Sequence, residues 1–242
     1  MQLLLSKDLI TDMVKLFILL ANICLPAVSI FLAIEFPATP FRWWFSLLIT
    51  LHVIARMWET FFTSKEKEPR SFEGDWTLAV GTFAYIGLCF VIVFEFFLIP
   101  KEINFPLFFL GLVLYIFASR LRWWGQAALG KQWAIHVVGE EKIKKHRLLQ
   151  IGPYEFIRHP IYSGILIEEI ALPVLANTYY ALGLAALVNI PLLLMRLFIE
   201  EKKSLEKFGD DYSVYCRETG RFFPKRGCYF LFFKKMFTEI FR

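Results

Sequence analysis

The chain has 242 residues, of which 57% are hydrophobic and 18% are aromatic, and its formal net charge is +5. A soluble domain of this length does not need so much apolar surface, so the composition indicates an integral membrane protein. The basic residues cluster beside apolar segments, which is typical of cytoplasmic membrane loops and is not the signature of a nucleic-acid-binding protein.

Six apolar segments are expected to form helices, at residues 12–34, 41–62, 76–99, 105–124, 161–177 and 179–199. Each of the first four has about the 20 residues that a helix needs to cross the hydrocarbon core of a bilayer. The last two are shorter or are joined by Thr178 alone, so we expect them to be tilted or to form a tight helical hairpin. The predicted fold class is therefore an all-α integral membrane protein with about six transmembrane helical segments.

The distribution of lysine and arginine predicts which side of the membrane each loop faces. Basic residues concentrate between the second and third segments, between the fourth and fifth, and after the sixth, whereas the intervening turns hold only Arg42 and Lys101. Because basic loops stay in the cytoplasm, we expect the N-terminus and all three basic regions to be cytoplasmic.

One domain with three regions is expected along the chain. Residues 1–124 form four N-terminal transmembrane helices, residues 125–224 form the catalytic region, and residues 225–242 form a tail. The polar insert 125–158 should fold on the cytoplasmic face. From Cys228 onward, large aromatic residues alternate with Lys234, Lys235 and Arg242, which is typical of an interfacial helix on an anionic surface. A frayed basic tail is the equally weighted alternative.

Arg196 and Glu200 follow the apolar run of the sixth segment, and their spacing of four places them on one helical face. Taken alone, such a pair is often an ordinary ion pair at a helix end. Further ionisable and aromatic side chains converge in sequence on the same cytoplasmic edge: His146, Arg147, Tyr154, Arg158, His159 and Tyr162. We therefore predict that Arg196, Glu200, His159 and Tyr162 share one cavity.

His159 and Pro160 are expected to open the fifth segment. Proline is tolerated in a first helical turn, and the free N–H groups of that turn can bind an anionic group. A simple cap or turn role for His159 is the alternative. Later in the segment, Glu168 and Glu169 must face the bundle interior, pair, or be protonated, because charge at membrane depth is costly.

His52, Arg56 and Glu59 form one stripe at helical spacing on the second segment. We expect pairing between helices there, with pocket lining as the second possibility. The four cysteines (Cys24, Cys89, Cys216 and Cys228) form no Cys-x-x-Cys pair and have no histidine pattern for zinc, so we expect no metal.

Four motifs occur in a fixed order in the C-terminal part of the chain. They are LGKQW at 129–133, GPYEFIRHPIYSG at 152–164, Arg196-x-x-x-Glu200-Glu201, and FGDDYSVY followed by RFFP at 221–224. At these residues the chain resembles the isoprenylcysteine carboxyl methyltransferase family and its phospholipid methyltransferase relatives. The resemblance covers about residues 130–224, and the first four segments add only hydrophobicity to it.

The resemblance implies a helical membrane enzyme that holds S-adenosylmethionine in a pocket facing the cytoplasm, in a bacterial inner membrane or the endoplasmic reticulum. Carried over by position, the catalytic residues are Arg196, which faces the methyl acceptor, and Glu200, which also contacts the cofactor. The other implied cofactor contacts are His146, Arg147, Leu148, Leu149, Tyr154, His159, Pro160, Ile161 and Tyr162. Gly139 is also an implied cofactor contact, and it stands where relatives that act on prenylated proteins have a glutamine, so a side-chain contact is missing there.

The expected reaction is carboxyl O-methylation of a prenylated cysteine or a related lipidic carboxylate. A carboxylate is already ionised at neutral pH and needs no general base, and an arginine such as Arg196 can hold it with two hydrogen bonds. The expected partners are the lipid bilayer and a lipidic or prenylated acceptor, and no nucleic acid.

Three other functions remain open from the sequence. The same scaffold could methylate a phospholipid amine or a thiol. A reductase related to the sterol reductases would use NADPH, and its C-terminal segments also carry paired glutamates and tyrosines. A non-catalytic membrane scaffold is the last alternative, although a scaffold has no reason to concentrate so many ionisable groups at one edge.

Overall fold

The computed structural model describes residues 2–36, 40–62, 76–130 and 148–239, which form helices joined by short irregular segments. The elements are α1 (Gln2–Glu35), α2 (Pro40–Phe62), α3 (Trp76–Leu98), α4 (Phe105–Leu129), the 3₁₀ turn η3 (Gly152–Glu155), α5 (Pro160–Ala176), α6 (Tyr179–Leu184), the π-helical η4 (Ala185–Asn189), α7 (Ile190–Phe208), α8 (Asp210–Glu218) and α9 (Tyr229–Thr238). Within these residues the one extended pairing is an isolated bridge between Ile157 and Gly220. The predicted all-α class is confirmed.

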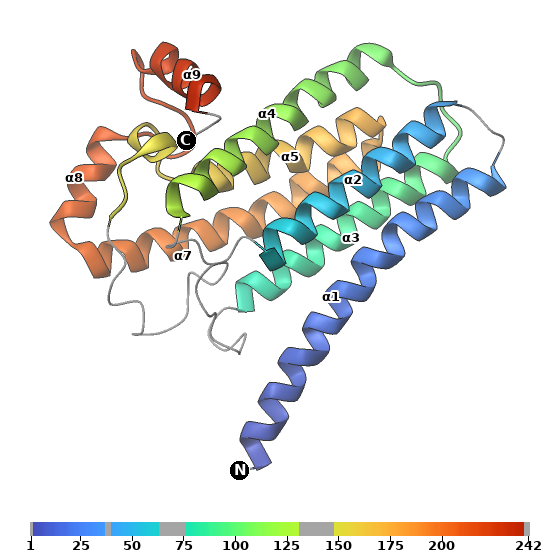
Figure 1. Cartoon of the computed structure of the whole chain (residues 1–242), viewed down its shortest axis with the longest axis horizontal. Helices are drawn as coiled ribbons and strands as arrows, with labels where there is room; N and C mark the ends of the chain where they lie inside the picture. The colour runs from blue at the N-terminus through green and yellow to red at the C-terminus, as the bar shows by residue number, and fades with distance from the viewer. Residues whose placement is uncertain (1, 37–39, 63–75, 131–147, 240–242) are drawn as a thin grey trace.

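Helices α2, α3, α4, α5 and α7 run side by side as a bundle, and α1 diverges from it toward its N-terminus (Figure 1). Elements α6, η4 and α7 form one continuous helical run from Tyr179 to Phe208. The end of the bundle at which α5 begins and α7 finishes also carries η3, α8 and α9 (Figure 1). We call this the site end of the bundle.

Four stretches among the described residues are long and apolar enough to cross a membrane: Leu16–Glu35, Trp76–Leu98, Phe105–Leu129 and Tyr179–Phe208. All six predicted segments are helical, but α2 and α5 are not among these four stretches. Helix α2 carries three ionisable side chains in its second half, and α5 has only 17 residues with two glutamates. The structure therefore supports a multi-pass protein without confirming six spans.

Two helices extend further toward the C-terminus than predicted. Helix α4 continues to Leu129 instead of ending at residue 124, and α7 continues to Phe208 instead of ending at residue 199. In both places the apolar run stops while residues with high helix propensity, chiefly alanine, glutamine, glutamate and lysine, continue the helix. The predicted start of the polar insert at residue 125 is wrong, because residues 125–129 belong to α4.

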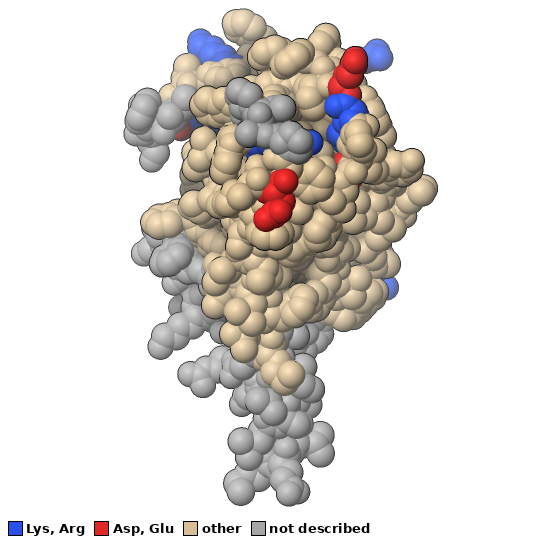
Figure 2. Space-filling view, turned by 90° about the vertical axis from the view of Figure 1, so that its right-hand side faces the viewer, with Lys and Arg blue, Asp and Glu red and all other residues tan. Residues whose placement is uncertain are grey.

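Large apolar side chains cover the outer faces of the helices. Examples that are more than half exposed are Phe17, Trp44, Leu51, Phe109 and Val113. Charged side chains are sparse on the face drawn in Figure 2, where the described surface is mostly neither acidic nor basic. Such an outer surface suits a lipid environment and leaves the polar side chains to meet inside the bundle.

Helices α4 and α5 are the most closely packed pair in the bundle. A methyl group added at Gly111 of α4 would lie 2.4 Å from the backbone nitrogen of Leu175 on α5. On the other side of the contact, a methyl group added at Gly164 would lie 2.9 Å from the carbonyl oxygen of Ala118. Small residues at these points let the two backbones approach each other, which is how membrane helices gain packing energy.

Glu168 of α5 is fully buried, and side chains from three neighbouring helices interact with its carboxylate. The Tyr85 hydroxyl of α3 donates a hydrogen bond to Glu168 Oε1. The guanidinium groups of Arg56 on α2 and Arg122 on α4 lie 3.3 Å and 3.6 Å from Glu168 Oε2. The prediction that Glu168 faces the interior and pairs is confirmed.

A second carboxylate, Glu59 of α2, completes this buried ion network. Glu59 accepts hydrogen bonds from Arg122 at 2.5 Å, from Arg56 at 2.9 Å and from the Trp123 indole at 3.1 Å. Two arginines and two glutamates therefore neutralise one another within the bundle, as the cost of burying charge requires.

His52 of α2 connects the network to two more helices. Its ring nitrogens lie 2.9 Å from the Tyr85 hydroxyl of α3 and 3.0 Å from the Tyr115 hydroxyl of α4. The expected role of the stripe formed by His52, Arg56 and Glu59 in pairing between helices is confirmed.

The opposite end of the bundle is closed by polar contacts around Glu95 of α3. Its carboxylate accepts hydrogen bonds from the backbone N–H groups of Tyr180 and Ala181, in the first turn of α6. Asn177 ends α5 in the left-handed conformation, and its carbonyl oxygen accepts a hydrogen bond from the Lys101 ammonium at 2.8 Å. These contacts fix the tight turn between α5 and α6.

We predict that Gly111→Ala destabilises the protein by about 1–3 kcal/mol, because its methyl group forces α4 and α5 apart. Gly87→Ala in α3 is the matched control, since no atom lies within 4 Å of its added methyl group. It should be neutral or stabilising by up to about 1 kcal/mol. Thermal unfolding in detergent measures both variants, and equal midpoints would contradict the close packing of α4 on α5.

Candidate active site

The first turn of α5 lies at the site end of the bundle. Helix α5 begins at Pro160, as predicted, and its first backbone hydrogen bond runs from the Ser163 N–H to the His159 carbonyl oxygen at 2.8 Å. The N–H groups of Ile161 and Tyr162 therefore have no acceptor within the helix. A helix start of this kind favours a negatively charged group in front of it.

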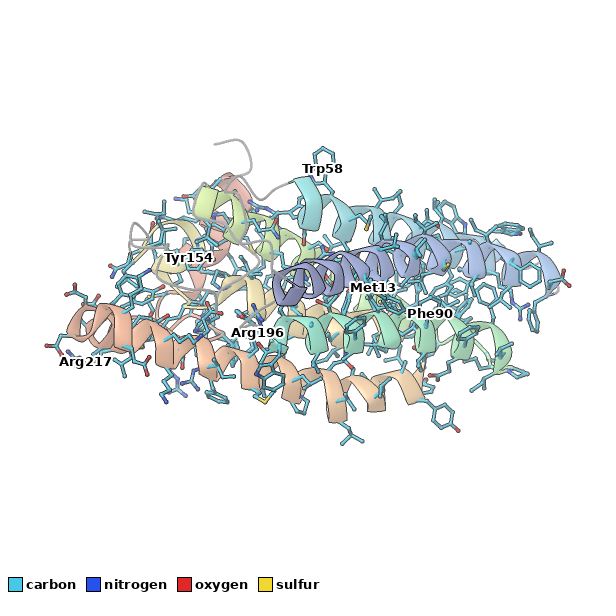
Figure 3. All side chains as sticks on the ribbon, turned by 90° about the horizontal axis from the view of Figure 1, so that it is seen from below. Met13, Trp58, Phe90, Tyr154, Arg196 and Arg217 are labelled. Atoms are coloured by element: carbon cyan, nitrogen blue, oxygen red, sulfur yellow. The ribbon has the colours of Figure 1, made fainter. Side chains whose placement is uncertain are left out.

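Arg196 of α7 contacts both α5 and α3. Its Nε donates a hydrogen bond to the Tyr162 hydroxyl at 3.0 Å, and its Nη1 donates to Thr77 Oγ1 of α3 at 3.1 Å. Arg196 is only 8% exposed. Figure 3 shows it on α7 close to the start of α3. Three helices thus meet at one buried cation.

Glu200 lies one turn after Arg196 on α7, and its carboxylate interacts with the same Tyr162 hydroxyl. The predicted meeting of Arg196, Glu200 and Tyr162 is therefore seen. Glu200 Oε2 is buried and has no hydrogen-bond partner among the described residues. Burial raises the pKa of Tyr154 in η3 well above its usual value, and the nearby Glu200 carboxylate raises it further. The carboxylate of Glu200 thus faces Tyr162 and Tyr154 with one oxygen still able to accept a hydrogen bond.

Glu201, the next residue, is fully engaged by other side chains. Its carboxylate lies 3.1 Å from His159 Nε2 and 3.2 Å from Arg158 Nε. Arg221 donates to both of its oxygens, at 2.7 Å and 3.2 Å. His159 occupies the N-cap position of α5 without capping the helix through its side chain, which is held by Glu201 while its ring packs edge-on against Tyr162.

Residues 219–222 hold the start of α5 in place from outside. The Arg158 N–H donates to the Gly220 carbonyl oxygen at 2.8 Å, and the Gly220 N–H donates to the Phe156 carbonyl oxygen at 3.1 Å. Gly220 tolerates no side chain, since an added methyl group would lie 1.7 Å from the Phe223 carbonyl oxygen. The Tyr215 hydroxyl of α8 supports η3 by donating to the Tyr154 carbonyl oxygen at 2.8 Å.

The remaining cofactor contacts stay predictions, and some of them lie outside the described residues. Pro160 and Ile161 are buried against Gly125 of α4, so only the N–H of Ile161 remains available at the site. Leu148 and Leu149 are half-buried in the irregular segment before η3 and make no hydrogen bond to the cluster among the described residues. Three predicted contacts lie outside the described residues: Gly139, His146 and Arg147.

Sequence reasoning assigned no role to three side chains that complete the site. Thr77 gives no signal in the sequence, because it is one polar residue at the start of an apolar segment. Glu201 was visible in the paired-glutamate motif, and Arg221 in the RFFP motif, but no spacing rule joins residues twenty apart. In the described part of the chain no group of three His, Cys, Asp or Glu side chains is arranged to hold a metal ion.

The arrangement combines a buried cation, two hydroxyl groups, a carboxylate oxygen without a partner and a helix start. Such a set can hold an anionic group at Arg196 or at the first turn of α5, and hydrogen-bond donors at Glu200. The groups lie close together and away from water, so a ligand placed among them would be strongly oriented.

Residues 110–206 match the model of the isoprenylcysteine carboxyl methyltransferase (ICMT) family. The protein-S-isoprenylcysteine O-methyltransferase of Schizosaccharomyces pombe is 31% identical over 80 residues, which are 33% of this chain and 34% of that protein. The enzyme of the same name from Dictyostelium discoideum is 24% identical over 174 residues, 69% of this chain and 70% of that protein.

A third relative is named for a different acceptor. The methanethiol S-methyltransferase 1 of Bradyrhizobium diazoefficiens is 32% identical over 94 residues, which are 38% of this chain and 30% of that protein. The chain thus spans about a third of the length of two of these relatives. The family match contains α5, Arg196 and Glu200, so the part of the chain that carries the candidate site is similar to the isoprenylcysteine carboxyl methyltransferase family, and the names of the relatives support a methyltransferase.

Proposed function

We propose that the protein transfers a methyl group from S-adenosylmethionine to the carboxylate of a prenylated cysteine or a related lipid, at a site facing the cytoplasm. The observation that supports this most strongly is the meeting of Arg196, Tyr162 and Glu200 at the start of α5. The S. pombe and D. discoideum relatives are named for the methylation of isoprenylcysteine. The carboxylate acceptor follows from those names together with the buried guanidinium.

The side chains at the site fit S-adenosylmethionine, which supplies the methyl group when bound. Glu200 Oε2, buried and without a partner in the described part of the chain, can accept hydrogen bonds from hydroxyl or ammonium groups. The N–H groups at the start of α5 can hold a carboxylate. Gly139, His146 and Arg147 remain proposed contacts from the family motifs.

Arg196 positions the acceptor for the reaction. Its guanidinium can hold a carboxylate with two hydrogen bonds, which orients one carboxylate oxygen for attack. Tyr162 and Thr77 fix the plane of that guanidinium through its Nε and Nη1 atoms. No proton has to be removed, so positioning and the exclusion of water account for the catalysis.

A lipid acceptor suits the place of the site in the fold. Arg196 and Glu200 lie near the end of the apolar run Tyr179–Phe208, so a headgroup held there leaves its chain beside the membrane-spanning part of the bundle. Among the described residues, the basic side chains of α7, α8 and α9 gather at this end, which supports a cytoplasmic orientation.

Helix α9 supports the same orientation as an interfacial helix. It packs its buried residues Phe232 and Met236 against α4 and η3, whereas Phe230 and Phe237 are more than half exposed. Lys235 pairs with Glu155 of η3 at 2.6 Å, and Lys234 is exposed. Exposed aromatics beside lysines are typical of a helix that lies at a membrane surface.

A thiol is the second candidate acceptor, favoured by the relative named methanethiol S-methyltransferase. A thiol must lose its proton before it attacks, so its rate should rise with pH toward the thiol pKa. A carboxylate is ionised throughout the neutral pH range. The rate of its methylation should therefore not depend on pH through ionisation of the acceptor.

We predict that Arg196→Ala lowers kcat/KM for the lipid carboxylate by about 100-fold, because a charge-assisted bidentate contact is lost. Binding of S-adenosylmethionine, measured by equilibrium dialysis, should persist. Arg42→Ala is the control, since Arg42 stacks on Phe36 and Phe97 at the opposite end of the bundle. Unchanged turnover in the Arg196 variant would rule out its proposed role.

We predict the converse pattern for Glu200→Gln. Loss of the negative charge should weaken S-adenosylmethionine binding by about tenfold, since hydrogen bonds to charged groups are the stronger ones. Glu206→Gln is the matched control, because Glu206 is exposed on the same helix. A dissociation constant equal to that of the wild type would show that Glu200 does not contact the cofactor.

A further inference from the structure

Glu169 and Asn189 form a second polar pair inside the bundle, and the proposed methyl transfer does not use it. Glu169 of α5 is 4% exposed, and Asn189, the last residue of η4, is 3% exposed. The Asn189 side chain is paired with the Glu169 carboxyl group. In the described residues Glu169 Oε2 is buried without a hydrogen-bond partner, and neither polar side-chain atom of Asn189 has a partner outside this pair.

The neighbouring Glu168 differs in its charge partners, because the guanidinium groups of Arg56 and Arg122 form ion pairs with its carboxylate and Tyr85 donates a hydrogen bond to its Oε1. A buried polar group without a partner destabilises the fold, and apolar residues at these two positions would avoid the cost. Asn189 also belongs to a π-helical segment, a deviation that is frequent at functional sites. Both observations indicate that a ligand group completes the pair.

Glu169 and Asn189 face each other across α5 and η4 in the same way as Tyr162 and Arg196 do across α5 and α7. Tyr162 and Glu169 are seven residues apart on α5, and Arg196 and Asn189 are seven residues apart on the antiparallel run of η4 and α7. Seven residues are two helical turns, so each pair of residues lies on one helical face. At 1.5 Å per residue the second pair lies about 10 Å deeper in the bundle than the first.

We propose that Glu169 and Asn189 bind a hydroxyl group on the chain of the lipid acceptor, about 10 Å from the carboxylate held by Arg196. The hydroxyl donates to Glu169 Oε2 and accepts from Asn189 Nδ2, which gives these two buried atoms a partner. This inference rests on the proposed function. It assigns the substrate class as an oxygenated lipid acid, because a plain hydrocarbon chain would leave the pair unsatisfied.

Two synthetic acceptors test the subsite. Both are thioether carboxylic acids with alkyl chains of equal length, and one carries a hydroxyl group about 10 Å from its carboxylate. The measured quantity is the ratio of their kcat/KM values with labelled S-adenosylmethionine, a ratio that cancels any general loss of activity. We expect the wild type to prefer the hydroxylated acceptor by about tenfold.

The double variant Glu169→Leu, Asn189→Leu should lose this preference and unfold at a higher temperature, since it removes unsatisfied buried groups. Asn189→Leu alone gives the same test if the double variant does not fold. Asn22→Leu is the matched control, because Asn22 donates to the Ile18 carbonyl oxygen of its own helix α1, and it should keep the tenfold ratio.

A wild-type ratio near one, or a ratio unchanged in the leucine variants, would overturn the subsite. Methyl transfer itself would stand in that case, because both acceptors would still be methylated. Failure to methylate either acceptor by protein that binds S-adenosylmethionine would instead overturn the proposed acceptor, and the subsite with it.

Discussion

Glu168 of α5 is fully buried, so its carboxylate must find every hydrogen-bond and charge partner inside the bundle. Tyr85, Arg56 and Arg122 supply these partners from α3, α2 and α4. Removing one partner of a buried ion pair costs about 3–5 kcal/mol, because the remaining charge is left uncompensated. The rotation and depth of α5 are therefore determined by three neighbouring helices at once, and its close packing on α4 adds a steric constraint.

The position of α5 in turn determines the candidate active site. Tyr162, six residues before Glu168, is turned toward Arg196 of α7, and His159 is turned toward Glu201. Arg196 also contacts α3 through Thr77. Two of the three helices that form the cluster, α3 and α5, are thus joined to each other through the buried ion network. Glu201 supports the site indirectly, because its contacts join the start of α5 to residues 219–222.

Residue types and helical spacing were enough to predict the helices, the pairing of the stripe on α2 and the common face of Arg196 and Glu200. Motif resemblance was needed for the family, because hydrophobic periodicity carries no information about chemistry. Thr77 and the link from Glu201 to Arg221 could not be predicted, since they depend on contacts between distant segments. The π-helical turn that buries Asn189 also leaves no mark in an apolar sequence.

The chemical identity of the methylated atom tests the central claim most directly. Wild-type protein is incubated with methyl-labelled S-adenosylmethionine and a prenylated cysteine, and the lipid product is then treated with alkali. A methyl ester releases labelled methanol under these conditions, and we expect the label to be recovered in that form. Label that stays on the lipid after alkali would place the methyl group on sulfur or nitrogen, and would contradict a carboxylate held by Arg196.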